Sequence, residues 1–196
     1  MMSVAERRAG WWGVAFVVLL LAEAAMVSLP TGKTSGAQLK SFYDTHAQII
    51  LMQQLLGAIA MIPLVAFAIS LGARRSPWLF AGTALVVITE LATNALPLTI
   101  LFTNPTAGAA HSLTLLEDLA DSALFLAIAV LVIAASIRET RWLRAIGLLV
   151  AALSIVRAGL SPLGIDAIDQ VAPIGFILFI VLLAARQILG KTNPPA

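Results

Sequence analysis

The sequence predicts an all-α membrane protein, a bundle of six transmembrane helices joined by short loops. Hydrophobic residues make up 60% of the chain and charged residues 11%, and the mean hydropathy is +0.99. A soluble domain carries about 25% charged residues. A chain this apolar cannot cover itself with polar side chains, which excludes a soluble globular protein. It also has too much apolar surface to stay disordered, which excludes a disordered protein. The apolar runs are continuous and lack apolar/polar alternation, which favours helices over a barrel.

Six segments are long enough to cross about 30 Å of hydrocarbon, which takes roughly 20 apolar residues in a helix. We expect the spans at about residues 11–29, 47–73, 78–102, 113–137, 142–160 and 171–189. They take up about two-thirds of the chain, so residues 1–196 are predicted to form one membrane domain. The first segment has the basic start of a signal peptide, but its length and its two tryptophans favour a retained span.

The basic residues predict the orientation of the bundle. With a cytoplasmic N-terminus, nine Lys and Arg residues fall on the inner side and only Lys33 and Lys40 on the outer side. The nine are Arg7, Arg8, Arg74, Arg75, Arg138, Arg141, Arg144, Arg186 and Lys191. This bias is the positive-inside pattern, and the four tryptophans all lie at the inner ends of spans. We therefore predict a multi-pass protein of the cell membrane with both termini in the cytoplasm.

The outer loops differ in character. Residues 30–46 have apolar residues at helical spacing after Ser35, which predicts a short interfacial helix with Ser35 as its N-cap. Residues 160–171 contain Asp166 and Asp169 and predict a polar turn region.

Four ionisable residues are predicted to lie deep inside the membrane, where a charge is costly and marks a candidate functional site. Glu23 and Glu90 each lie 12 residues from a tryptophan at the inner end of their span, so each is about 18 Å deep. Asp121 and Arg157 also lie inside, because the remaining segments would be too short to span without them. We expect these four charges, from four helices, to share the outer half of the bundle.

Three carboxylates and one guanidinium would leave two surplus negative charges if all were ionised. That surplus predicts a protonated carboxyl or a bound cation. The alternative is a closed network in which Arg157 pairs with Asp121 or Glu90 and only holds helices together. Thr93 and Asn94 follow Glu90 by three and four residues and so share its helix face. The candidate ligand- or proton-binding residues are Glu90, Asn94, Glu23, Asp121, Arg157 and Thr93, with Glu90 foremost.

Further polar residues lie at the outer ends of the spans and could form a pocket mouth. They are His46, His111, Glu117, Asp118 and Gln53. For Gln53 and its neighbour Gln54, interfacial solvation is the favoured interpretation. The two histidines and two acids match no metal-motif spacing, and the chain has no cysteine. No phosphate or dinucleotide fingerprint is present. We therefore expect no metal, no cofactor and no catalytic residue.

Three stretches carry a resemblance to known proteins. Residues 35–46 (SGAQLKSFYDTH), 116–125 (LEDLADSALF) and 142–147 (WLRAIG) resemble the corresponding parts of a group of uncharacterised actinobacterial multi-span membrane proteins. The resemblance covers about two-thirds of the chain. It implies the same topology, and it implies neither an activity nor any site residue.

Three functions stay open. The first is an outward-facing acidic pocket that binds or transports a cation or an amine-bearing, partly apolar solute, with coupling to protons. The second is an accessory or assembly subunit of a membrane complex. The third is a membrane enzyme acting on a lipid or isoprenoid, with Glu90 and Asp121 as acid and base; no nucleophile or metal motif supports it. The expected partners are the lipid bilayer, a solute or proton, and another copy or membrane-complex subunit. No basic tail exists for nucleic acid.

Overall fold

The described part of the chain is entirely helical apart from its loops, as predicted. A computed structural model describes residues 4–72, 76–163, 165 and 168–189. The helices are α1 (Val4–Ala24), α2 (Gly36–Ser70), α3 (Pro77–Thr103), α4 (Ala107–Ser136), α5 (Arg141–Leu160) and α6 (Val171–Leu189), with a 3₁₀ turn η2 (Ser161–Leu163). No strand occurs among these residues.

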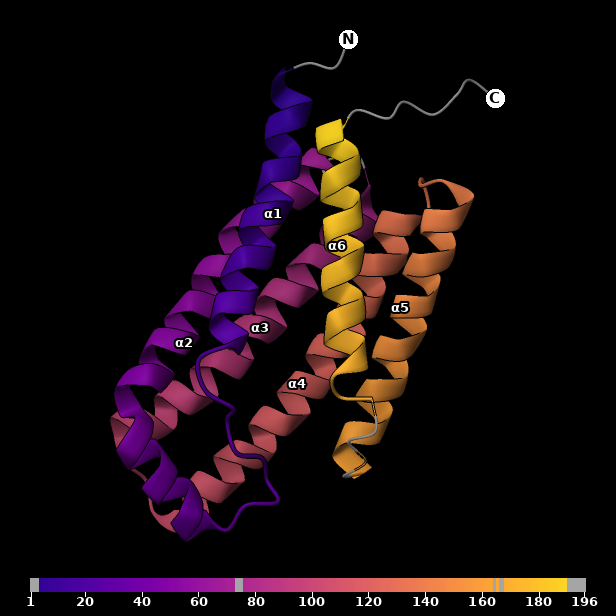
Figure 1. The fold of residues 1–196 in the computed structure, drawn as a ribbon. Helices are drawn as coiled ribbons and strands as arrows, with labels where there is room; N and C mark the ends of the chain where they lie inside the picture. Colours follow the sequence, from indigo (N-terminus) through magenta and orange to yellow (C-terminus); the bar gives the residue numbers. More distant parts are fainter. Residues whose placement is uncertain (1–3, 73–75, 164, 166–167, 190–196) are drawn as a thin grey trace.

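The six helices form a closed ring (Figure 1). Each helix packs against the next one in the chain, and α6 packs against α1 to complete the ring. Helix α2 also contacts α4 across it. The start of α1 and the end of α6 lie at the same end of the bundle. We call this the terminal end, and we call the opposite end, where the α1–α2, α3–α4 and α5–α6 connections lie, the distal end.

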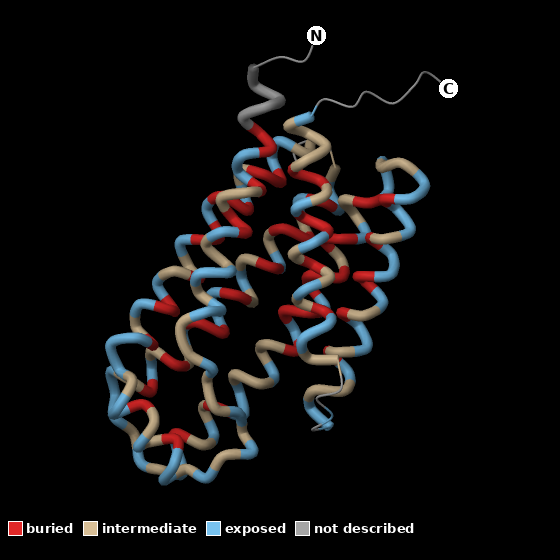
Figure 2. Tube along the Cα trace, viewed as in Figure 1, coloured by how far each residue is buried: buried red, intermediate tan, exposed pale blue. Residues whose placement is uncertain are grey.

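The helix lengths and their exteriors suit a lipid bilayer. Five helices, α2 to α6, are long and apolar enough to cross a membrane. The apolar part of α1, residues 9–24, is shorter. Exposed residues line the outward faces of the helices and buried residues the inward faces (Figure 2). The outward faces carry large apolar side chains such as Ile62, Ile88 and Leu149. These features support a multi-pass membrane protein.

The last four predicted spans fall within α3 to α6 to within one residue, but the first two differ from their helices. Helix α1 ends at Ala24 rather than at residue 29. Pro30 disfavours a helical conformation of the residue before it. The Val27 carbonyl instead accepts a hydrogen bond from Gln53 Nε2 at 3.0 Å. The Gln53 side chain of α2 thus satisfies a backbone carbonyl of the segment that follows α1.

The predicted interfacial helix and the predicted span 47–73 form one helix, α2. It begins after Ser35, whose backbone N–H and hydroxyl both donate to Gln38 Oε1, so the predicted N-cap position is confirmed. The helix bends at His46, whose φ of −111° and ψ of 16° are not helical. His46 Nδ1 lies 3.0 Å from the Phe42 carbonyl, and its ring stacks on Phe42. The sequence predicted two separate helices that meet at His46. The structure has one continuous helix that bends there, and the contacts of His46 with Phe42 stabilise the bend.

Two apolar clusters bracket the middle of the bundle. The larger one fills most of the terminal half and includes Phe67, Leu143 and Phe179. A smaller cluster of Tyr43, Ile50, Ile100 and Ala110 joins α2, α3 and α4 at the distal end. Between them, along each of these three helices, lie the polar residues of the candidate site.

Candidate functional site

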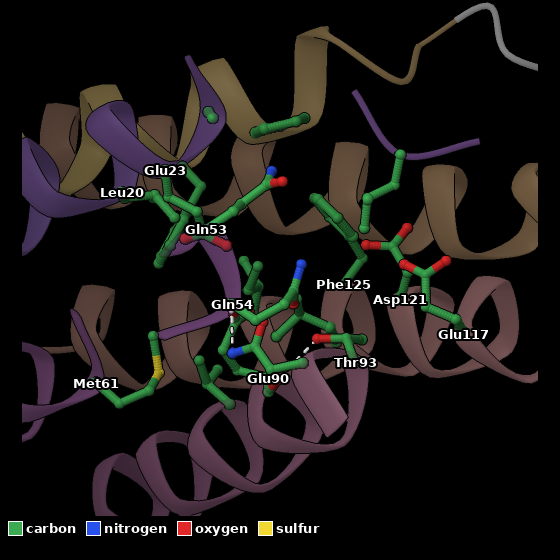
Figure 3. A pocket seen from close by; sticks show the side chains of 18 of the residues that line it. Leu20, Glu23, Gln53, Gln54, Met61, Glu90, Thr93, Glu117, Asp121 and Phe125 are labelled. Carbon is green, nitrogen blue, oxygen red and sulfur yellow. Dashed lines mark hydrogen bonds between the residues drawn. The ribbon is translucent and has the colours of Figure 1, made fainter. Parts of the chain in front are cut away.

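A cavity of about 280 Å³ lies inside the ring, and all six helices contribute to its wall. Its polar lining consists of Glu23, Gln53, Gln54, Glu90, Thr93, Asn94, Glu117, Asp121 and Arg157 (Figure 3). The structure thus brings together all six residues predicted as ligand- or proton-binding, which come from four helices. They lie on helices that run in opposite directions, and they meet because their depths along the bundle are similar.

The cavity is polar toward the distal end and apolar toward the terminal end. On α2, α3 and α4 apolar lining residues lie on the terminal side of the polar ones, as Met61, Val86 and Ile128 show, and on α1 Phe16 lies on the terminal side of Glu23. Helix α6 adds Phe176 to this apolar part of the lining. The rings of Phe16 and Phe176 pack edge to face with centroids 6.0 Å apart, so α1 and α6 are in contact at the apolar end of the cavity. A bound molecule would therefore meet acidic groups at one end and aromatic and aliphatic groups at the other.

Arg157 is paired with Asp121, one of the two partners predicted for it. Arg157 NH1 lies 2.8 Å from Asp121 Oδ2, and its Nε lies 3.6 Å from Asp169 Oδ1. The guanidinium carbon lies 3.7 Å from the centre of the Phe125 ring. Among the described residues, Arg157 is the one cationic side chain that lines the cavity, and it is engaged by α4 and by the loop before α6. Asp166, the other acid of that loop, lies outside the described residues.

Glu90 is buried, with 8% of its surface exposed, and it has no cationic partner among the described residues. Its Oε1 accepts a hydrogen bond from Asn94 Nδ2 at 3.4 Å, and the Thr93 hydroxyl donates to the Glu90 backbone carbonyl at 2.8 Å. The predicted face of Glu90, Thr93 and Asn94 is therefore present and buried. Pro97, one turn further on, has no N–H, so the Thr93 carbonyl lacks its usual helical donor.

Glu23 lies directly against α2. A Cβ atom placed on Gly57 would be 2.7 Å from Glu23 Oε1, so the carboxylate occupies space that any larger residue would fill. Glu23 Oε2 is buried and has no hydrogen-bond partner in the described chain. Buried polar atoms of folded proteins almost always have one.

The amides of α2 are buried, which contradicts the expectation of interfacial solvation. Gln53 is 8% exposed and Gln54 is 4% exposed. Gln53 Nε2 donates a hydrogen bond to the Val27 carbonyl, whereas Gln53 Oε1 has no partner among the described residues. No hydrogen bond links Gln54 to a described residue. Sequence reasoning missed Gln54 and Gly57 as site residues. A signal was available, because Gln54, Gly57 and Met61 recur at helical spacing and so share one face.

The predicted pocket mouth is only partly assembled. Glu117 and Gln53 line the cavity. Asp118 lies elsewhere, accepting a 2.8 Å hydrogen bond from the Gly32 backbone N–H beside a separate surface pocket. His46 contacts the Phe42 carbonyl, and His111 does not line the cavity. Among the described residues no group of three or more metal-ligating side chains is found.

Comparisons of the chain with protein families, with curated proteins and with solved structures found no match. The resemblance to actinobacterial multi-span membrane proteins therefore stays a prediction.

Proposed function

We propose that this protein binds a small organic cation, an amine with an apolar body, in the cavity at the centre of its membrane bundle. The observation that carries the proposal is the imbalance of charge around the cavity. Four carboxyl groups line it, from Glu23, Glu90, Glu117 and Asp121, against one guanidinium. Asp121 already holds that guanidinium. Unpaired carboxylates in a membrane interior are costly unless they are protonated or meet a cation.

The graded lining supports an amphipathic ligand rather than a metal ion. An ammonium group would be bound by the carboxylates, and the apolar body would pack on Phe16, Met61 and Phe176. The volume of about 280 Å³ lies near the lower end of the roughly 300–1,000 Å³ of small-molecule sites, so the ligand is of metabolite size.

The orientation and the coupling are part of the proposal. The positive-inside pattern makes the distal, acidic end extracellular, so the cation enters from outside. A carboxyl group that binds a cation when ionised and a proton when empty would couple the two, and Glu90 is the residue to which we assign this exchange. An accessory subunit would need only dry packing around its charges, and a cavity lined by Glu90 favours a binding role.

Equilibrium binding to the purified protein tests the proposal. We expect at least one of butylamine, 2-phenylethylamine and tetraethylammonium to bind and to raise the melting temperature. The neutral 2-phenylethanol should do neither, because it has no charge to meet the carboxylates. Failure of all three cations, or equal binding of 2-phenylethanol and 2-phenylethylamine, would overturn the proposal.

Glu90→Gln separates binding from folding. The amide has the shape of the protonated acid and no charge, so we expect amine affinity to fall at least tenfold while the melting temperature of the empty protein barely changes. Asp44→Asn is the matched control, because Asp44 is an exposed acid outside the cavity. Unchanged amine affinity of Glu90→Gln would mean that Glu90 is only a packing residue.

A further inference from the structure

We infer that the cavity is specific for a primary amine, whose ammonium group is held between α1, α2 and α3 by Glu23, Gln54 and Glu90, with Gly57 as the residue that positions Glu23. This inference rests on the proposed function and deepens it. We call these four residues the ammonium subsite.

The ammonium subsite contains acceptors that the protein itself leaves unused. Glu23 Oε2 is buried without a hydrogen bond. Gln54, with 4% of its surface exposed, lines the cavity and has no partner in the described chain. Glu90 Oε1 has only the long 3.4 Å contact with Asn94. A buried polar atom without a partner, such as Glu23 Oε2, is rare in native structures, and this one and Gln54 border the cavity.

The three acceptors come from three different helices, which suits the geometry of a primary ammonium. Such a group has three N–H donors and no acceptor. Two carboxylates and one amide oxygen would satisfy all three donors, and the charge would offset the repulsion between Glu23 and Glu90. A quaternary ammonium has no N–H and would leave all three acceptors unsatisfied.

The other carboxylates of the cavity are less suited to this role. Asp121 is held by Arg157 at 2.8 Å, and Glu117 lies on the same face of α4 one turn away (Figure 3). An incoming ammonium group would meet the positive charge of Arg157 there. Glu23 and Glu90 form no ion pair with any described residue.

Gly57 makes the position of Glu23 possible. A methyl group at this residue would lie 2.7 Å from Oε1, 2.9 Å from Cδ and 3.0 Å from Oε2 of Glu23, so the carboxylate would have to leave α2. Glycine inside a helix is destabilising relative to alanine. At position 57 this loss has a structural reason, because the Glu23 carboxylate occupies the space that an alanine side chain would fill. Gly57 is therefore a positioning residue of the ammonium subsite.

The first experiment measures binding of 2-phenylethylamine to the wild type and to Gly57→Ala. We expect Gly57→Ala to lose at least tenfold in affinity. Adding Glu23→Asp should restore much of it, because the shorter side chain keeps its carboxylate clear of the new methyl group. Gly159→Ala is the matched control, since its Cβ would meet nothing within 4 Å, and it should bind like the wild type. Wild-type affinity of Gly57→Ala, or no recovery in the double variant, would overturn the inference.

The second experiment needs no variant, so it tests the ammonium subsite even if Gly57→Ala fails to fold. We expect the wild type to bind 2-phenylethylamine at least tenfold more tightly than its N,N,N-trimethyl derivative, which has the same body and charge but no N–H. Equal binding of the two would overturn the ammonium subsite and leave the proposed function standing. Binding of neither compound, nor of any other cation in the series, would instead count against the proposed function itself.

Discussion

Arg157 joins three parts of the bundle around one guanidinium. It pairs with Asp121 of α4, approaches Asp169 ahead of α6, and lies over the ring of Phe125. A guanidinium suits this position because it is planar and always charged, so it can pair in its plane and stack on an aromatic face at once. Its side chain is 12% exposed and that of Asp121 is 29% exposed, so the pair is partly shielded from solvent.

We expect Arg157→Leu to be destabilising and the double change with Asp121→Asn to be less so. Removing the cation alone leaves Asp121 without its partner; breaking a fully buried pair costs roughly 3–5 kcal/mol, which is the upper bound for this partly exposed pair. In the double variant the remaining amide is neutral and needs no counter-charge. Thermal unfolding in detergent measures both effects, and strictly additive losses from the two single changes would mean that they are not partners.

At the scale of the elements, α3 and α4 pack backbone to backbone where Gly82 faces Leu131. A Cβ atom on Gly82 would lie 2.8 Å from Leu131 Cα and 2.9 Å from its N. A small residue at such a crossing lets two membrane helices pack backbone to backbone. This contact holds the terminal half of α3 in place, while its distal half carries Glu90 into the cavity.

Gly82→Val should lower the melting temperature clearly. The added atoms meet backbone rather than a movable side chain, and overpacking typically costs about 1–3 kcal/mol. Gly159→Val is the control, because position 159 is exposed and open. Similar effects of the two substitutions would show that the loss reflects helix propensity rather than the α3–α4 contact.

For the whole molecule, the ring of six antiparallel helices brings the start of α1 and the end of α6 to the same end (Figure 1). Gly10 of α1 abuts Ile188 of α6, which ties the two helices together there. The membrane orientation proposed from the positive-inside pattern can be tested directly, since the chain contains no cysteine.

We expect an impermeant maleimide to label Ser35→Cys but not Arg138→Cys in intact cells. Both positions are exposed: Ser35 lies in the α1–α2 connection at the distal end, and Arg138 lies in the α4–α5 connection at the opposite end. Permeabilised cells should label both, which controls for reactivity. Labelling of position 138 alone in intact cells would invert the proposed orientation.

Much of the candidate site could be predicted from the sequence because depth and helix face depend only on spacing along the chain. Glu90, Thr93 and Asn94 share a face by helical periodicity, and Arg157 cannot leave the membrane without shortening its span. Helical spacing also places Gln54 on one face with Gly57 and Met61, but it does not tell whether that face is buried. The position of Gln54 at the edge of a span is compatible with solvent, and only the packing of α1 and α3 around it makes it buried.

The sequence by itself determined the helical class, the approximate positions of the long apolar helices and the level along them at which the charges meet, because membrane thickness sets span length and backbone chemistry requires helices. Only the tertiary structure decided which acid holds Arg157, that Gly57 makes room for Glu23, and that α1 ends at Ala24. These depend on how each helix is rotated about its axis and on which neighbours it meets. That choice is made by the side chains of all six helices packing together, which no spacing within a single helix encodes.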